Sequence, residues 1–337
     1  MMIAGPYLLY LGHSDDEVGI KTSRGLAVFR RELCVGEFRH HDCPLTLSLP
    51  RMGFPEAVTA GAKTLVLGIA NAGGMLGADL VRDAVAAIEA GLDVASGLHN
   101  RLRDEPALVD AAARHGRKLH DVRDPRPDIP IGNGKPRAGK RLLTVGTDCS
   151  VGKMYATLCL ETGMRARGMR ADFRATGQTG ILIAGGGVPL DAVIADFISG
   201  AIEQVSPARD DGGWDLIEGQ GSLFHPSFAG VSTGLLHGAQ PDALVLCHDP
   251  VREHMRGLPH YQLPGLKQTL EANLAVARLT NPAVQAVGVA LNTSKMTREA
   301  AERLCADTAD ELGLPCTDPF AMGVEPIVDR VVSCFGA

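Results

Sequence analysis

Eight consecutive residues at 146–153, Gly-Thr-Asp-Cys-Ser-Val-Gly-Lys, have the residue types of a phosphate-binding loop. They follow the apolar run Leu-Leu-Thr-Val and precede a helical pattern, which is the strand–loop–helix context that such a loop requires. Backbone N–H groups of the turn, the positive end of the helix dipole and the lysine ammonium would together bind an anion. The predicted phosphate-binding residues are Gly146, Thr147, Asp148, Cys149, Ser150, Val151, Gly152 and Lys153.

Met154 stands where phosphoryl-transfer enzymes with such a loop have a Ser or Thr whose hydroxyl binds magnesium. A thioether does not replace that hydroxyl as a ligand for a hard cation. A phosphate that is only bound, and never cleaved, does not need the metal. The sequence therefore predicts a phosphate site that works without a metal ion, although the hydroxyls of Ser150 and Thr157 could still reach one.

Three residues at or beyond predicted strand ends are candidates for catalysis. Glu218 ends the predicted strand 214–218, at the edge where ligands gather in open α/β sheets, and could act as a base or hold an ammonium. His225 follows, and histidine is the usual general base in enzymes because a free imidazole titrates near neutrality. Arg174 ends the strand 171–174 and could bind a carboxylate or phosphate through two hydrogen bonds. The alternatives are a structural carboxylate, a hydrogen-bonded loop histidine and a surface charge.

A second group of polar and basic residues is predicted to bind the substrate. Cations would hold carboxylates, and hydroxyl or amide groups would donate to a phosphate or to an oxyanion. For each of them a surface charge or a loop cap is the competing interpretation. The group consists of Thr176, Gln178, Thr179, Arg252, Arg256 and His260.

Histidines and cysteines give only weak signals for a metal or a nucleophile. Five of the eleven histidines fall between 225 and 260, but no pair has the i, i+4 spacing of helical zinc ligands. The run His-His-Asp-Cys at 40–43 is a weaker cue, and a solvated turn explains it. Cys149 could form an acetyl-cysteine, since a helix N-terminus lowers a thiol pKa, but a small residue in a tight turn is the better interpretation. No metal is expected.

A segment rich in Pro and Gly, 121–140, divides the chain. Prolines remove backbone donors, so the segment is predicted to run extended between two domains, 1–135 and 136–337. Before it, strand patterns at 63–70 and 92–98 alternate with helix patterns at 78–91 and 105–116, which is typical of a Rossmann-like parallel sheet. The first 60 residues contain strand-like pieces at 25–29 and 45–50, predicted to form a small separate layer.

After the linker the alternation resumes, and the fold class is α/β throughout. Strands are expected at 142–145, 171–174, 214–218, 243–248 and 286–292, and helices at 152–167, 191–204, 266–279 and 297–312. With the phosphate loop, this pattern predicts a P-loop NTPase-like parallel sheet. The glycine-rich segment 67–77 in the first half does not have the G-x-G-x-x-G spacing, so packing glycines are favoured over an NAD site.

The composition excludes several classes of protein. Of 337 residues, 45% are hydrophobic, and the net charge of −6 argues against nucleic-acid binding and against attraction to an anionic membrane. Eight cysteines without a C-x-x-C pair are typical of reduced thiols. The apolar run 6–11 is too short for a signal peptide or a membrane span. A cytoplasmic protein is expected, and apolar helices in both halves suggest a homo-oligomer.

The motifs resemble two families. The loop is similar to the long phosphate loop of dethiobiotin synthetase, and Glu218-Gly219 is similar to the end of a strand in that family. A longer resemblance, to the D-glutamate N-acetyltransferases, is carried by GTDCSVGKMYAT, DFRATGQTGILIAGGG, WDLIEGQGSLFHPSFAGVSTGLLHG, QPDALVLCHDP and HMRGLPHY. The strings GIANAGG and ASGLHNRL extend it into the first half, so it covers most of the chain.

This resemblance implies transfer of an acetyl group from acetyl-coenzyme A to the amine of D-glutamate. Acetyl-coenzyme A carries a diphosphate that only has to be held. This agrees with Met154, which stands in place of the Ser or Thr that would bind magnesium. The expected partners are therefore these two small molecules. The alternatives are an ATP- and magnesium-dependent ligase or kinase of the dethiobiotin synthetase type, or a nucleotide-binding module without catalytic activity.

Overall fold

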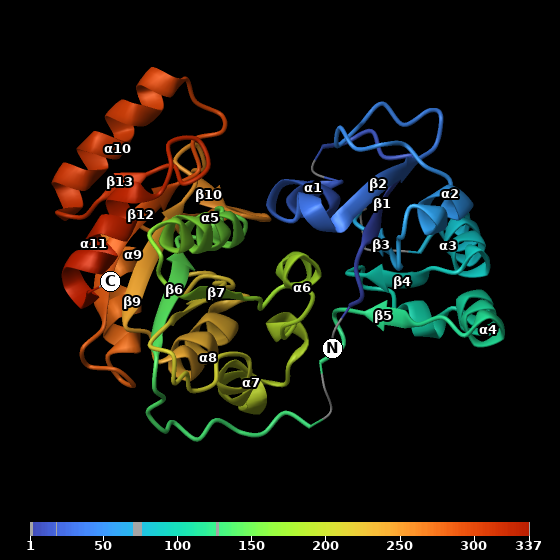
Figure 1. The fold of residues 1–337 in the computed structure, drawn as a ribbon. Coiled ribbons are helices and arrows are strands. Elements are labelled where there is room, and N and C mark those ends of the chain that lie inside the picture. The colour runs from blue at the N-terminus through green and yellow to red at the C-terminus, as the bar shows by residue number, and fades with distance from the viewer. Residues whose placement is uncertain (1–2, 18, 70–75, 126–127, 337) are drawn as a thin grey trace. The chain divides into compact units, whose positions relative to one another are not determined.

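The computed structural model describes residues 3–17, 19–69, 76–125 and 128–336 (Figure 1). The chain forms two compact units, each with its own parallel sheet. The first unit comprises Met1–Pro125 with Gly177–Pro189, and the second comprises Arg126–Thr176 with Leu190–Ala337. Among the helices of the described residues, none has the length and apolar character that a membrane span requires.

The first unit is built on five parallel strands in the order β2-β1-β3-β4-β5. Apolar side chains of the central strands pack against α2, α3 and α4 in one buried core. Helix α1 contacts α6, where the hydroxyls of Thr22 and Thr179 lie 2.8 Å apart. The strands are β1 (Tyr7–Gly12), β2 (Cys34–Arg39), β3 (Thr64–Leu67), β4 (Asp93–Ser96) and β5 (Leu119–Asp121); the helices are α1 (Lys21–Phe29), α2 (Phe54–Thr59), α3 (Ala78–Ala90), α4 (Pro106–His115) and α6 (Gln178–Ala184).

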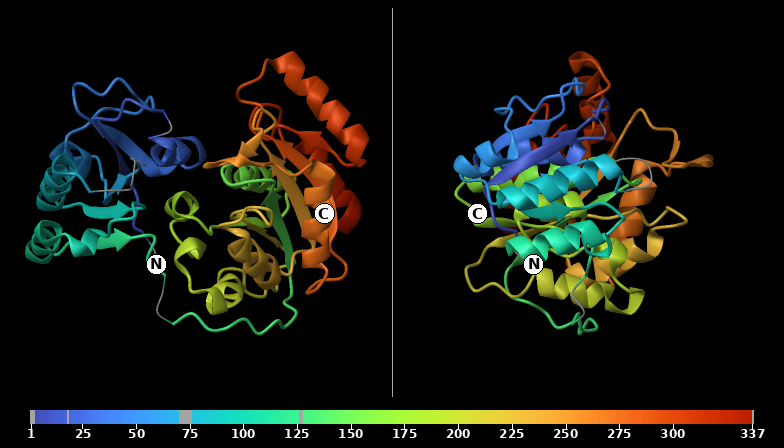
Figure 2. Two further views of the ribbon diagram at one scale, coloured as in Figure 1. Left: turned by 180° about the vertical axis from the view of Figure 1, so that it is seen from behind. Right: turned by 90° about the vertical axis from the view of Figure 1, so that its right-hand side faces the viewer.

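The second unit is built on six parallel strands in the order β13-β12-β9-β6-β8-β7. Helices α5 and α11 pack on the core beside the central strands. Helix α8 packs against both α7 and α9 (Figure 2). The strands are β6 (Lys140–Gly146), β7 (Ala171–Arg174), β8 (Trp214–Ile217), β9 (Ala243–His248), β12 (Gln285–Leu291) and β13 (Cys316–Thr317), with the hairpin β10 (His254–Met255) and β11 (Leu258–Gln262); the helices are α5 (Lys153–Ala166), α7 (Ile198–Val205), α8 (Ala229–Ala239), α9 (Leu266–Ala277), α10 (Arg298–Leu312) and α11 (Glu325–Phe335).

The parallel α/β organisation predicted for both halves is confirmed, and three local predictions are wrong. Residues 25–29 belong to helix α1, and residues 45–50 form no strand. The first 60 residues do not form a separate layer, because β1 and β2 pair in parallel within the five-stranded sheet. The helix expected at 191–204 is broken into two 3₁₀ turns followed by α7. Residues 70–75 of the glycine-rich segment lie outside the described residues.

The linker contains no helix or strand in its described residues 122–125 and 128–139, and it packs against α7 and α8. The carboxylate of Glu203 accepts the N–H groups of Asn133 and Gly134, and Gln240 donates to the carbonyl of Gly134 over 2.9 Å. Gly200 lies so close to the linker that a Cβ there would stand 1.8 Å from the Pro130 carbonyl oxygen. Residues 128–139 of the linker are therefore a packed part of the second unit, whereas residues 122–125 belong to the first.

Gly200→Ala is expected to lower the free energy of unfolding by about 1–3 kcal/mol, because the new methyl group would push the linker away from α7. Gly230→Ala is the matched control, since Gly230 also lies in a helix but its Cβ would meet no atom within 4 Å. That control should gain up to about 1 kcal/mol from helix propensity. Urea unfolding measures both, and equal stability of the two variants would contradict a packed linker.

Candidate functional site

The phosphate loop lies between the end of β6 at Gly146 and the start of α5 at Lys153. Ser150 has φ of 53° and Gly152 has φ of 98°, so the chain turns twice through the left-handed region before the helix begins. Such a turn directs successive N–H groups toward one concave surface. The first N–H groups of α5 have no acceptor within the helix, and the helix dipole adds positive charge at the same point. The loop therefore has the backbone form of an anion site.

Lys153 folds back along the inside of this loop. Its side chain is buried, and Nζ donates to the carbonyls of Asp148 (2.7 Å) and Gly221 (2.9 Å). An ammonium has three protons, and no acceptor for the third is found within the described residues. A Cβ at Gly146 would lie 3.2 Å from Nζ, so glycine leaves room for the lysine. Burial lowers the pKa of Lys153 from its ordinary value.

A cluster that we call the arginine latch fixes the outer part of the loop; it consists of Asp148, Arg252 and Arg256. The buried Asp148 carboxylate accepts Nη1 of Arg252 (2.8 Å) and the backbone N–H of Arg256 (2.7 Å). Arg252 also donates to the carbonyls of Cys149 (2.6 Å) and Ser150 (3.2 Å). Arg256 donates from its guanidinium to the Ser150 hydroxyl. The segment that follows β9 therefore holds the loop in its conformation.

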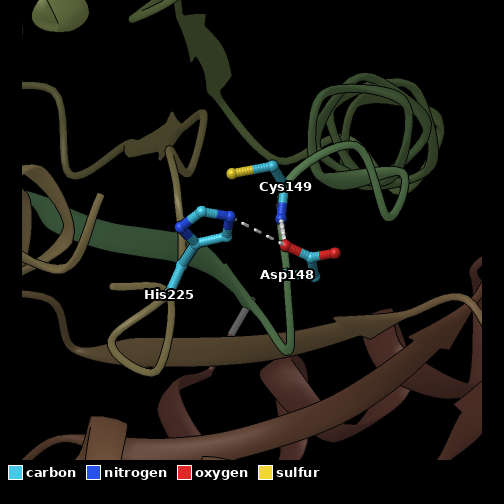
Figure 3. A group of neighbouring side chains, drawn as sticks. All are labelled: Asp148, Cys149 and His225. Atoms are coloured by element: carbon cyan, nitrogen blue, oxygen red, sulfur yellow. Dashed lines mark hydrogen bonds and ion pairs between the residues drawn. The ribbon is translucent and has the colours of Figure 1, made fainter. Parts of the chain in front are cut away.

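Asp148, Cys149 and His225 bring three possible metal ligands within 4.8 Å of one another (Figure 3). The carboxylate already has a cationic partner in Arg252. Burial raises the pKa of Cys149, although Lys153 opposes the shift, so the sulfur is a neutral thiol and a poor ligand or nucleophile near neutral pH. The residues are better suited to hydrogen bonding within the loop than to binding a cation.

The His-His-Asp-Cys run in the first unit is explained by internal pairs. His40 binds Asp83 through Nε2 (2.7 Å), and Asp42 binds His13 through Nδ1 (2.8 Å). The rings of His13 and His40 stack at 3.9 Å with an angle of 4° between their planes. A metal ion lies close to the plane of each imidazole that binds it, so two parallel stacked rings are badly placed to share one ion.

His225 is 2% exposed, and both of its ring nitrogens face protein atoms. Nδ1 accepts the backbone N–H of Ser227 (3.2 Å), which leaves the proton of the neutral ring on Nε2. That Nε2 lies 3.5 Å from the Arg256 carbonyl and 4.0 Å from an Asp148 oxygen. In this arrangement the Nε2 proton of His225 points toward the arginine latch, and its Nδ1 lone pair is used by the Ser227 N–H, so neither nitrogen is free to accept a substrate proton. Its assignment as a catalytic base stays a prediction.

Glu218 connects the ends of β7 and β8. Its carboxylate accepts the Thr176 N–H (3.0 Å), and its carbonyl accepts the Thr176 hydroxyl (2.6 Å). Gln220, which the sequence patterns did not single out, donates to the same hydroxyl over 3.1 Å. The charge of Glu218 acts on Lys153 and partly offsets the lowering of the lysine pKa. Glu218 and Thr176 therefore lie at the phosphate-loop end of the site, and a role for them in binding or catalysis stays a prediction.

Four of the predicted residues have other surroundings within their own units. Arg174 forms ion pairs with the buried Asp215 (2.8 Å) and, at 4.0 Å, with Asp172, so its guanidinium belongs to a structural cluster of charges. Gln178 and Thr179 lie on α6 in the first unit, where the Gln178 side chain packs against Gly97. His260 lies exposed on β11 of the hairpin.

Ser222 and Thr144, which sequence patterns did not single out, join Thr147, Thr157 and His248 in a set of hydrogen bonds behind the loop. Thr147 bonds to His248 (2.9 Å), and Ser222 donates to the Thr147 carbonyl (3.0 Å). Thr157 donates to the Lys153 carbonyl and lies 2.9 Å from the Thr144 hydroxyl, so it faces the interior and not a bound phosphate. A cavity of about 10 Å³ behind the loop has room for one water molecule only.

Comparisons with known proteins agree with this two-part structure. Residues 130–328 match the family described as a domain of unknown function, DUF1611_C, P-loop domain, and residues 40–125 match DUF1611_N, a Rossmann-like domain. A DUF1611 family protein from Anabaena variabilis, known from a crystal structure, has a TM-score of 0.87 and 32% identity over 98% of this chain and all of its own.

Two relatives have names that state an activity. A protein from Pseudoalteromonas is 51% identical over 97% of this chain and 99% of its own length. One from Tritonibacter scottomollicae is 50% identical over 98% of this chain and 100% of its own length. Both relatives are named D-glutamate N-acetyltransferase.

Proposed function

Because this chain belongs to the DUF1611 family, together with the D-glutamate N-acetyltransferases of Pseudoalteromonas and Tritonibacter scottomollicae, we propose that it acetylates the amino group of D-glutamate with acetyl-coenzyme A as the donor. The chain is an enzyme of the acyltransferase class, given identities of about half over nearly the full length of both relatives. The names of the relatives state neither the acetyl donor nor whether a metal takes part. For these two points we argue from the site.

Acetyl-coenzyme A as the donor is supported by the phosphate loop, which lacks the Ser or Thr hydroxyl that would bind magnesium. The loop offers backbone N–H groups and a buried ammonium with one proton to spare, while Met154 follows the lysine. Amide formation from a thioester breaks a C–S bond and leaves the diphosphate intact, so the loop has only to hold that anion. The thiolate leaves, and no metal needs to stabilise a departing phosphate.

The residues around the loop have different proposed tasks. Lys153 and the loop amides hold the coenzyme diphosphate, and the arginine latch keeps the loop in shape before the coenzyme arrives. Arg256, whose guanidinium lies at the Ser150 hydroxyl, is proposed to bind an anionic group of a substrate. Glu218 is proposed to hold the substrate ammonium or to take its proton, since a carboxylate can do either.

A thiol-release assay with acetyl-coenzyme A tests this function. We expect free thiol to form with D-glutamate and at most slowly with L-glutamate, at a rate that EDTA does not change. The ligase or kinase alternative predicts release of inorganic phosphate from ATP and magnesium with an amino acid. A phosphate signal without thiol release would contradict the proposed reaction, and ligand binding without either product would favour a binding module.

A further inference from the structure

An exposed aromatic side chain stands beside the first turn of the phosphate-binding helix. Phe320, in the turn after β13, is 64% exposed. Its ring meets that of Tyr155 edge-on, with centroids 6.1 Å apart and planes at 83°. Tyr155 lies two residues after Lys153 on α5. An apolar ring is therefore presented to solvent within a short distance of the loop that would hold a phosphate.

The backbone that carries Phe320 is fixed by a buried carboxylate. Oδ1 of Asp318 accepts the N–H groups of Phe320 (2.9 Å) and Ala321 (3.0 Å). Oδ2 of the same residue accepts the N–H of Thr293 (2.8 Å) and its hydroxyl (2.6 Å). Asp318 thus ties the loops after β12 and β13 together. The exposed ring projects from a rigid turn, which limits the entropy lost when a ligand contacts it.

Asn292 adds a polar group at the same edge of the sheet. It follows β12, and its backbone N–H donates to the His248 carbonyl over 2.8 Å. Its Cβ would lie 3.7 Å from a Cβ built on Gly152, so the side chain starts beside the last glycine of the phosphate loop. Its carboxamide oxygen accepts the Ser294 N–H at 3.4 Å. The oxygen has a second lone pair and the amide nitrogen has two donor protons, the combination that recognises the N6 and N7 edge of adenine.

We propose that Phe320, Tyr155 and Asn292 form a purine subsite that binds the adenine of the coenzyme whose diphosphate lies on the phosphate loop. The identification of the coenzyme rests on the proposed function. Adenine is the flat aromatic part of acetyl-coenzyme A, and it is joined through ribose to the diphosphate. D-glutamate has no aromatic ring, and the pantetheine arm is a flexible chain of amides. A single exposed Phe needs no explanation by itself, but a rigid one beside an anion site and a carboxamide has the composition of a nucleotide subsite.

Phe320→Ala tests the subsite by calorimetric titration of two ligands that share the phosphate end. We expect the Kd for coenzyme A to rise by about 5- to 140-fold, because stacking of a base on an aromatic ring contributes about 1–3 kcal/mol. The Kd for 4′-phosphopantetheine, which lacks the adenosine, should not change. Leu279→Ala is the matched control, since Leu279 is 72% exposed on the same unit. An equal loss for both ligands, or none, would overturn the proposal.

Phe320→Trp provides a spectroscopic test that does not depend on turnover. The chain has one tryptophan, Trp214, which is buried, so the new indole would be the exposed fluorophore. We expect coenzyme A to quench its emission and 4′-phosphopantetheine to leave it unchanged. Quenching by magnesium–ATP but not by coenzyme A would contradict the coenzyme assignment and favour the ligase or kinase. If the wild type releases thiol, while Phe320→Ala leaves the Kd for coenzyme A unchanged and coenzyme A does not quench Phe320→Trp, the subsite is wrong and the proposed function stands.

Discussion

Lys153→Ala is expected to raise the Kd for coenzyme A by about 10- to 100-fold, the effect of losing one hydrogen bond from a charged donor. The D-glutamate KM should change little, because the lysine ammonium lies inside the phosphate loop, bonded to the carbonyls of Asp148 and Gly221. Calorimetric titration with coenzyme A and steady-state rates at saturating coenzyme measure the two effects separately.

Lys140→Ala is the matched control for this substitution. Lys140 begins β6 while Lys153 follows its far end, so the same charge is removed at the opposite end of one strand. The Lys140 ammonium lies over the Phe335 ring, away from the loop. Unchanged affinity for coenzyme A in Lys153→Ala, or an equal loss in both variants, would contradict a phosphate-binding role for the loop.

The pH dependence of binding gives the same prediction a second test. Burial lowers the pKa of Lys153, and a bound diphosphate favours the charged form of the lysine. Affinity for coenzyme A should therefore fall as the pH rises through this lowered pKa, below the pH at which an ordinary lysine titrates. Binding near that pH should take up a proton, which calorimetry in buffers of different ionisation enthalpy detects. Lys153→Ala should lack both effects.

Much of the fold followed from local patterns because parallel strands and their helices have strong signals. Local sequence patterns predicted β9 and β7 to the residue, and α3 and α10 to within one. The helix expected at 191–204 failed because apolar spacing continues through two 3₁₀ turns, where Ile194 is 71% exposed. Residues 25–29 have strand-like types but belong to helix α1. The packing of α1 on the sheet overrides their local propensity, and a sequence pattern does not contain that tertiary contact.

The part of the candidate site that is one continuous segment was predictable from the sequence. The part that depends on contacts between distant residues was not. The phosphate loop is one continuous string, and the family resemblance carried by the long motifs is confirmed by relatives at about 50% identity. The latch joins Asp148 to residues more than a hundred positions away, and no spacing rule connects them. Arg174 was selected for its place at a strand end, but its side chain pairs with Asp215 instead.

The return of residues 177–189 to the first unit is a further feature that local patterns did not reveal. Thr176 stays in the second unit beside Glu218, while Thr179, three residues later, bonds to Thr22 in the first. A motif that reads as one substrate-binding string is therefore divided between two units. A contiguous sequence motif predicted shared function, and the fold places its members in different units.

Breaking the arginine latch should destabilise the second unit and weaken coenzyme binding together. Asp148→Ala removes a fully buried carboxylate. Arg252 keeps only its longer ion pair with Asp249 (3.4 Å), and the Cys149 and Arg256 N–H groups lose their acceptor. We expect the free energy of unfolding to fall by about 3–5 kcal/mol. Arg252→Met should cost a similar amount, because it leaves the fully buried Asp148 carboxylate without its cation. The double variant should be less destabilised than the sum by about 1–3 kcal/mol.

Asp121 supplies the matched control, because it makes the same kind of contacts in the first unit. Its buried carboxylate accepts the Leu102 N–H (2.6 Å) and the Arg103 guanidinium (2.9 Å), with no phosphate loop involved. Asp121→Ala should therefore cost similar stability in urea unfolding and leave the affinity for coenzyme A unchanged below the unfolding transition. Asp148→Ala should lose that affinity under the same conditions, since the loop amides are no longer held in one concave surface. Equal coenzyme affinity in these two variants would mean that the latch serves stability alone and does not shape the phosphate site.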